Sequence, residues 1–289
     1  MRNWVSSRLI DLHTHTNESD GTLEPVELIR EATRVGLEAL GITDHDTFAG
    51  YDKALPAARS AGLELVCGIE LSTKDDGQTV HLLGYFLSGS PGAIIRERMA
   101  EIQQSRRDRN DRLVARLNGL GLDITLDEVR AVGRGMTGRP HFARVLVRKG
   151  YAATIQEAFE RYIGEGASAF VERDSITLYD AIQLVAGSGG LPVLAHPIRL
   201  RSRDTEEEDA RIARLKTAGL AGIEVYHSDH SPPDVVRYRI LASKYGLAIT
   251  GGSDFHGDTK PNVLLGTGRS GNVSVPIEVL SRLRAQAAI

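Results

Sequence analysis

The chain has little cysteine, few aromatic residues and no long apolar run in its 289 residues. Its single cysteine, Cys67, excludes an internal disulfide framework and a cysteine-rich zinc site. No run approaches the roughly 18 apolar residues that a membrane span needs, and the first residues lack a signal-peptide core. The formal net charge of −3 gives no chain-wide basic field for nucleic acid or an anionic membrane. We therefore expect a cytoplasmic protein with no membrane partner and no obligate protein partner.

The sequence does contain a regular alternation of short apolar runs and amphipathic stretches. Strands are predicted over 9–12, 39–42, 65–69, 80–86, 192–195, 222–226 and 247–250. Helices are predicted over 24–36, 50–61, 177–187, 205–218, 233–245 and 275–288. This order indicates an α/β fold with a mainly parallel sheet, and seven strands suit a closed or nearly closed barrel.

The segment from 91 to 175 breaks this alternation, because it contains helical patterns and no convincing strand. Helices are predicted over 96–118, 139–149 and 154–162. We interpret 91–175 as a helical insertion between the fourth and fifth strands, and 1–90 with 176–289 as the barrel. Residues 96–149 hold 13 Lys or Arg and 7 Asp or Glu, a net of +6, which leaves −9 for the rest. A basic lobe on an acidic barrel suggests an anionic ligand between them; a solvated basic helix is an equally good reading.

Histidines and carboxylates gather at the predicted strand ends. In chain order, these residues are His13, His15, Asp20, His45, Glu70, His81, His196, Asp254 and His256. The carboxyl ends of parallel barrel strands share one face, so we expect these side chains to meet there. Residues two apart on a strand point to the same side, which applies to the pair His13 and His15.

Each of these residues alone has an ordinary alternative, such as a hydrogen-bonded structural histidine, a turn residue or a helix cap. Together, six histidines and three carboxylates are too many for one metal ion or for a satisfied polar core. They would fill the ligand shells of two or three divalent ions, and nitrogen and oxygen donors without thiolate favour Mn, Fe or Zn. Such a site is suited to hydrolysis of a phosphate ester. The sequence has no serine-hydrolase elbow, no Walker loop and no dinucleotide-binding glycine motif.

The motifs that carry these residues resemble the polymerase and histidinol phosphatase (PHP) superfamily. The matching segments are Asp11–His15, Asp20-Gly21, Thr43–Asp46, Gly68–Glu70, His81, Ala195–Pro197 and Ser253–His256. The resemblance implies a distorted barrel of seven strands and two or three metal ions, with Mn expected. It implies one ion on His13, His15, Glu70 and Asp254, a second on Glu70, His81 and His196, and a third on Asp20, His45 and His256. Asp44 and Asp46 would orient His45 or simply cap their loop.

The predicted insertion is similar to the group of nucleoside 3′,5′-bisphosphate phosphatases, some of which are 5′-to-3′ exonucleases on short RNA. The similarity lies in Ser105–Asn110 and Thr137–Arg144. Arginine forks bind phosphate in a bidentate manner. The candidate substrate-binding residues are Arg106, Arg109, Arg134, Arg139, His141 and, after the sixth strand, His227.

The predicted activity is therefore removal of the 3′-phosphate of a nucleoside 3′,5′-bisphosphate, a small nucleotide substrate. A metal-bridging hydroxide would attack phosphorus, and a metal-bound water or His196 would protonate the departing oxygen. The alternatives are 5′-to-3′ exoribonuclease activity on short RNA, histidinol-phosphate phosphatase activity, and an inactive accessory module. Retention of all nine candidate ligands argues against the inactive module.

Overall fold

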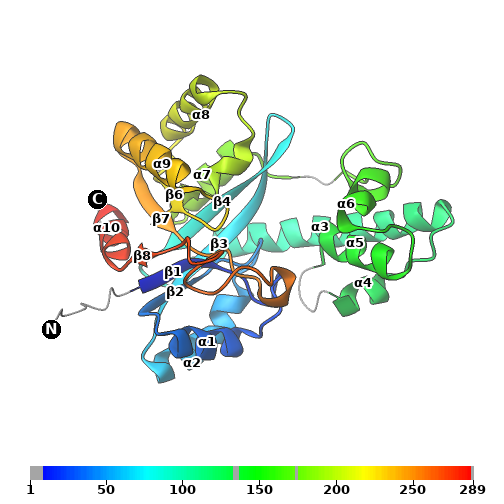
Figure 1. The fold of residues 1–289 in the computed structure, drawn as a ribbon, viewed down its shortest axis with the longest axis horizontal. Coiled ribbons are helices and arrows are strands. Elements are labelled where there is room, and N and C mark those ends of the chain that lie inside the picture. Colours follow the sequence, from blue (N-terminus) through cyan, green and yellow to red (C-terminus); the bar gives the residue numbers. More distant parts are fainter. Residues whose placement is uncertain (1–8, 133–136, 173–174, 288–289) are drawn as a thin grey trace.

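The computed structural model describes residues 9–132, 137–172 and 175–287, which form an α/β fold around one nearly closed, barrel-like sheet (Figure 1). Its strands are β1 (Leu9–Thr14), β2 (Ala39–Ile42), β3 (Glu64–Asp75), β4 (Gln78–Phe86), β5 (Leu191–Leu194), β6 (Gly222–Tyr226), β7 (Ala248–Gly251) and β8 (Val275–Pro276). The helices on the sheet are α1 (Pro25–Val35), α2 (Ala49–Ala61), α7 (Leu178–Gly187), α8 (Thr205–Thr217), α9 (Pro232–Tyr245) and α10 (Glu278–Ala287).

The strand order is β7-β6-β5-β4-β3-β2-β1-β8. The chain that follows β7 returns to β1 and nearly closes the barrel. There the backbone N–H of Asp254 donates to the carbonyl of His13 at 2.9 Å, and that of His15 donates to the carbonyl of Phe255 at 2.9 Å. These two bonds place the Asp254 segment beside the His13 segment, although they are far apart in the sequence.

Strand β4 differs from the prediction of a mainly parallel arrangement, because it runs antiparallel to both β3 and β5. The cause is the connection between β3 and β4, which consists of Asp76 (φ 47°) and Gly77 (φ 77°). Two residues in the left-handed region make a tight hairpin turn, and a parallel crossover would need a dozen or more residues. The reversal places the beginning of β4, where His81 lies, at the end of the barrel where its parallel neighbours finish.

The described sheet has eight strands, one more than predicted. The additional strand, β8, pairs with the start of β1 and occupies residues that we expected to begin the last helix. Pro276 explains the difference, since a proline disfavours helical geometry at the residue before it. The helix α10 begins two residues later, at Glu278.

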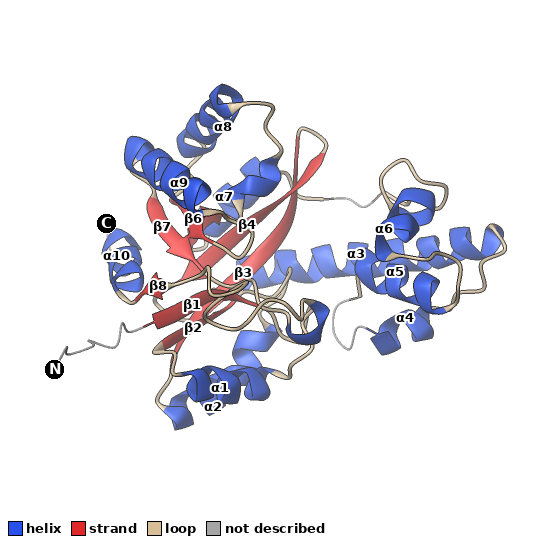
Figure 2. Cartoon of the chain, in the orientation of Figure 1, coloured by secondary structure: helices blue, strands red, loops and turns tan. Residues whose placement is uncertain are grey.

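Of the helices between β4 and α7, the first begins against the sheet and runs outward, and the others lie to one side of the sheet (Figures 1 and 2). These helices are α3 (Ala93–Gly119), α4 (Leu126–Val132), α5 (Arg139–Arg148), α6 (Ile155–Ala158) and the π-helical turn η1 (Phe159–Ile163). Helix α4 was not predicted. The far end of α3 packs on the others through an apolar cluster that includes Leu117, Phe142 and Leu146, separate from the cluster beneath α1, α2 and α7. No helix in the described ranges has the length and apolarity required to cross a membrane.

Candidate metal centre and adjoining cavity

The structure brings all nine predicted metal ligands to one end of the barrel. His13 lies near the end of β1, Glu70 within the long strand β3, and His81 near the start of β4. The other six follow strand ends: His15 and Asp20 after β1, His45 after β2, His196 after β5, and Asp254 and His256 after β7. The barrel topology therefore gathers residues from six strands at one place.

Glu70 lies at the centre of this group and is buried. Its Oε2 is 3.2 Å from Nε2 of His13 and 3.0 Å from Nε2 of His15. Its Oε1 is 2.8 Å from Nδ1 of His81 and 2.9 Å from Nε2 of His196. The two oxygens thus face two different pairs of histidines, which is the arrangement a carboxylate needs to bridge two cations.

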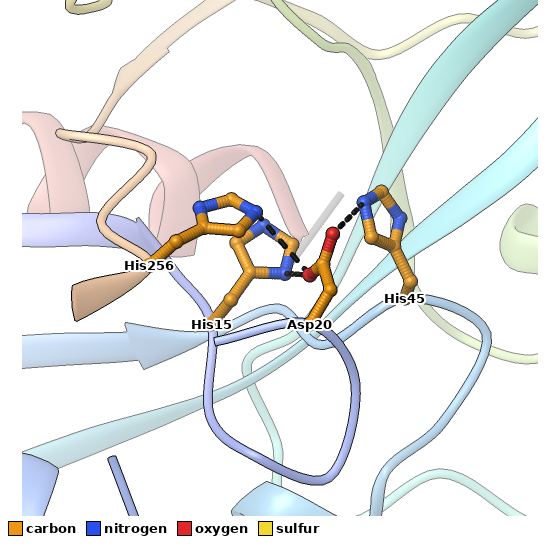
Figure 3. Close-up of side chains that lie close together, drawn as sticks. All are labelled: His15, Asp20, His45 and His256. Atoms are coloured by element: carbon orange, nitrogen blue, oxygen red, sulfur yellow. Dashed lines mark ion pairs between the residues drawn. The ribbon is translucent and has the colours of Figure 1, made fainter. Parts of the chain in front are cut away.

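Asp20 and three histidines form a second part of the site (Figure 3). Oδ1 of Asp20 lies 3.2 Å from Nε2 of His256 and 3.5 Å from Nδ1 of His15, and Oδ2 lies 3.8 Å from Nε2 of His45. Asp20 and His45 are partly exposed, whereas His15 and His256 are buried. This side of the site is therefore open to a ligand.

The nitrogen and oxygen atoms of these side chains are better placed to bind metal ions than to form hydrogen bonds with one another. Nε2 of His15 and Nδ1 of His81 are buried and make no hydrogen bond, although each lies within 3.0 Å of a Glu70 oxygen. Among the described residues, four sets of His, Asp and Glu have ligand atoms within 4.8 Å of one another. These sets are His13, His15, Glu70 and Asp254; His15, Asp20, His45 and His256; His45, Glu70 and His81; and His13, Glu224 and His227. Imidazole and carboxylate in such sets suit Mn, Fe or Zn.

The protonation of three of these residues, His15, His196 and Glu70, also favours ligation. Burial lowers the pKa of His15 to about 3 and holds the pKa of His196 well below its usual value, so both imidazoles are neutral at pH 7. Burial opposes ionisation of Glu70, yet the nearby histidines, His45 first, keep the pKa of this carboxyl well below its usual range. Neutral imidazole and ionised carboxylate are the metal-binding forms.

Two of the proposed ligands have unusual backbone geometry. His196 has φ 24° and Asp254 has φ 56°, both in the region that residues with a side chain rarely adopt. Such conformations persist where the surrounding contacts impose them, and they concentrate at functional sites. Here the contacts are visible, since the backbone N–H of His196 donates to Glu224 at 2.7 Å and that of Asp254 donates to His13.

Two buried carboxylates that the sequence analysis did not select support the site. Glu224 accepts the backbone N–H of His196 and lies 2.8 Å from Nδ1 of His13. Asp11 accepts hydrogen bonds from Ser253 and from the backbone N–H groups of His13 and Gly266. An available signal for Glu224 was its charge in the middle of the short, otherwise uncharged run Gly222–Tyr226.

The two aspartates beside His45 contact other segments. Asp44 accepts hydrogen bonds from Thr16 and from the Ser19 hydroxyl, at 2.6 to 2.8 Å, and so holds the loop that carries Asp20. Asp46 accepts the backbone N–H of Ser72 at 2.9 Å and pairs with Arg106 of α3. Orientation of His45 by these aspartates remains a prediction.

A cavity of about 530 Å³ joins the candidate metal ligands to the helical part of the chain. Its barrel side includes Asp20, His45, Glu70, His81, Asp254 and His256. Its helical side includes Arg106, Arg109, Arg139, His141 and Arg144. Four of the six predicted substrate-binding residues therefore line the same cavity as the candidate ligands.

The remaining two candidates are Arg134 and His227. Arg134 falls outside the described residues. His227 is buried behind Asp254; its Nδ1 accepts the backbone N–H of Asp229, and its Nε2 lies 3.2 Å from Oδ2 of Asp254. His227 is not among the residues that line this cavity, so its described contacts are those of a positioning residue for Asp254. Lys260 and Arg199, which were not predicted, contact the same oxygen at 2.6 and 3.3 Å.

Comparison with known proteins identifies the family. The model of the PHP domain matches residues 11–162. The 5′-3′ exoribonuclease of Haemophilus influenzae is 33% identical over 250 residues, which cover 85% of this chain and 89% of that protein. The 3′,5′-nucleoside bisphosphate phosphatase of Chromobacterium violaceum is 33% identical over 249 residues, which cover 86% and 87%.

A solved structure supports the same assignment over nearly the full length. It is a protein from Bifidobacterium adolescentis assigned as a metal-dependent phosphoesterase, with a TM-score of 0.78 and 33% identity over 96% of both chains. The resemblance seen in the sequence motifs is thereby confirmed. The chain belongs to the PHP domain family.

Proposed function

We propose that this metal-dependent PHP phosphoesterase hydrolyses the 3′-phosphate of nucleoside 3′,5′-bisphosphates to nucleoside 5′-monophosphate and phosphate. The observation that carries the proposal is a cavity that has candidate metal ligands on one wall and arginines on the other. A ligand with two phosphates would place one at each wall. Residues 1–90 and 176–289 then form the catalytic barrel, and 91–175 form the substrate-binding lobe.

The reacting phosphate belongs at the barrel wall. His13, His15, Glu70 and Asp254 would hold one ion, Glu70, His81 and His196 a second, and Asp20, His45 and His256 a third, with Mn as the expected metal. Bound there, such ions would supply an activated water and neutralise charge on the phosphoryl oxygens. His196, the candidate proton donor to the leaving oxygen, is neutral at pH 7 and is not among the residues that line the cavity, so a water is the better proton donor.

The other phosphate belongs at the lobe wall, near the start of α5. Nδ1 of His141 accepts the backbone N–H of Gly138 at 2.9 Å, so the proton of the neutral ring resides on Nε2, the other ring nitrogen. Burial lowers the pKa of Arg139, and the nearby positive charge of Arg106 lowers it further. A phosphate bound beside these residues would offset that repulsion.

A second candidate is release of 5′-mononucleotides from short RNA, which is favoured by the likeness to the Haemophilus influenzae exoribonuclease. Both reactions break the bond between phosphorus and the 3′ oxygen of a 5′-phosphorylated nucleotide. They differ only in whether the departing phosphate carries another nucleotide.

The direct test is phosphate release from adenosine 3′,5′-bisphosphate by the Mn-supplemented protein. We expect release with the wild type and loss with Glu70→Gln, which weakens a bridging ligand. Faster turnover of histidinol phosphate, or mononucleotide release from 5′-phosphorylated RNA at a higher rate, would assign one of the alternatives. A metal-loaded wild type that releases no phosphate from the bisphosphate contradicts the proposal.

A further inference from the structure

The lobe side of the cavity contains an apolar wall beside the arginines. Ile155, Phe159, Phe170 and Val171 line the same cavity as Arg139 and the candidate metal ligands. The guanidinium carbon of Arg139 lies 5.7 Å from the centre of the Phe170 ring. A ligand that consisted only of phosphate groups would need only the arginines and the metal site. The apolar wall therefore indicates that the ligand also has a flat apolar part.

The chain segments that carry the two phenylalanines are held in place by described contacts. Arg116 of α3 donates to the carbonyl of Phe170, and the flanking residues Ala169 and Val171 are buried. Phe159 begins the π-helical turn η1, and its carbonyl accepts the backbone N–H of Gly164 at 2.7 Å. Single π-helical turns occur frequently at functional sites. Both rings therefore project from backbone that is fixed before any ligand binds.

We propose that Phe170 and Phe159, together with Arg139, form a subsite that binds the nucleobase of the substrate by stacking. This subsite rests on the proposed function, because it gives the base of the nucleoside bisphosphate a place beside the phosphate-binding arginines. Aromatic rings and guanidinium planes are the groups on which nucleobases stack. The volume of about 530 Å³ lies in the range of pockets that enclose ligands of this size.

The composition of the wall also predicts its selectivity. Phe159, Phe170, Ile155 and Val171 have no polar side-chain atom that could read the edge of a base. Stacking tolerates every base, because each has a π-face, and it strengthens with the area of the ring system. The subsite therefore accepts all four bases, favours purines over pyrimidines, and gives nucleotides a higher affinity than sugar phosphates that lack a base.

The test is a binding measurement that does not depend on catalysis. Calorimetric titration of the protein with adenosine 5′-monophosphate, uridine 5′-monophosphate and ribose 5-phosphate gives the contribution of the base. We expect the adenine nucleotide to bind about tenfold to a hundredfold more tightly than ribose 5-phosphate, with the uridine nucleotide between them. In Phe170→Leu that ratio falls toward one, whereas Phe170→Tyr, which keeps the ring, restores it. Tyr179→Leu, on an exposed aromatic residue of α7, leaves the ratio unchanged.

The outcomes separate the subsite from the proposed reaction. Equal affinity for the nucleotides and ribose 5-phosphate in the wild type overturns the subsite, even where phosphate is released from the bisphosphate. An unchanged ratio in Phe170→Leu overturns it as well. Base-dependent binding that Phe170→Leu abolishes supports the subsite, even in a protein that does not hydrolyse the bisphosphate; that result would contradict the proposed reaction alone.

Discussion

Among individual residues, Glu224 links two of the proposed metal-ligand sets. One of its oxygens lies 2.8 Å from His13, and the other accepts the backbone N–H of His196 at 2.7 Å. The first contact holds Nδ1 of His13. The other ring nitrogen, Nε2, then points toward Glu70 and the other candidate ligands. Carboxylates in this position orient a ligating imidazole and raise its basicity.

Glu224→Gln should therefore weaken metal binding without unfolding the chain, since the amide keeps the shape and one acceptor. We expect about a tenfold to hundredfold loss of Mn affinity, measured by titration of the metal-free protein. The matched control is Glu206→Gln at the start of α8, where the side chain is exposed. If Glu224→Gln and the wild type bind Mn with equal affinity, Glu224 is not needed to orient His13.

His230 should make stability depend on pH. It is buried, its ring lies 2.8 Å from the carbonyl of Val225, and burial lowers its pKa to about 4. An unfolded histidine takes up its proton near pH 6.5, so the unfolded state binds more protons between these values. The stability provided by neutral His230 is complete above pH 6.5 and falls by about 3 kcal/mol as the pH drops to 4.

His230→Asn cannot titrate but still has a side-chain N–H for Val225. Its free energy of unfolding, measured by urea denaturation of the metal-free protein, should fall less steeply below pH 6.5 than that of the wild type. Parallel curves for the two proteins would mean that His230 does not remain neutral in the folded state.

At the scale of elements, helix α3 is attached to the barrel through Arg106. Its guanidinium pairs with the buried carboxylate of Asp46, and Gln103, one turn earlier, donates to the Asp46 carbonyl at 2.9 Å. The loop between β2 and α2 that bears His45 therefore contacts the same helix that leads into the lobe. Arg106 both lines the cavity and anchors the helix.

Arg106→Met should destabilise the protein by about 3 kcal/mol, because it leaves a buried carboxylate without its cation. The double variant Arg106→Met with Asp46→Asn should recover part of that loss. Arg107→Met, on the exposed neighbour in α3, should change stability by less than about 0.5 kcal/mol. Urea unfolding of the four proteins measures these differences, and an Arg106→Met protein as stable as the wild type refutes the anchoring role.

The sequence predicted elements better than it predicted their directions. The runs that became β2 and β6 were predicted at their observed bounds, because glycines and turn residues lie close to their ends. We predicted a mainly parallel sheet and assigned no direction to individual strands, whereas the tight turn at Asp76-Gly77 makes β4 antiparallel to both of its neighbours. Glu224 was missed because a lone acid in a strand gives no sign of its partner. Its role depends on contacts with His13, 211 residues away.

At the scale of the whole molecule, the barrel brings four carboxylates into one site: the buried Glu70, Glu224 and Asp254 and the partly exposed Asp20. Lys260 and Arg199 balance part of this charge at Asp254. His15 and His196 are neutral at pH 7, whereas Glu224, Glu70 and Asp254 outweigh burial and raise the pKa of His13 well above its usual value. His13 therefore offsets only part of the negative charge, and cations would complete the balance. Metal ions should therefore stabilise the folded chain as a whole.

Removal of metal should lower the midpoint of thermal unfolding by roughly 5–10 °C. This estimate compares the metal-free protein with a sample that contains free metal at about 100 times its dissociation constant. Differential scanning calorimetry with and without EDTA measures this shift, and added Mn should reverse it. Glu70→Gln should show a smaller shift than the wild type. A midpoint that does not respond to EDTA or Mn in the wild type would rule out this linkage.

The most direct measurement is the number of divalent ions per chain, determined by elemental analysis of the purified, Mn-supplemented protein. We expect two or three ions per wild-type chain and fewer in Glu70→Gln, because one carboxylate faces two pairs of histidines. A wild-type protein that retains no ion would contradict the claim that the candidate ligands on and after six strands of the barrel form a metal centre.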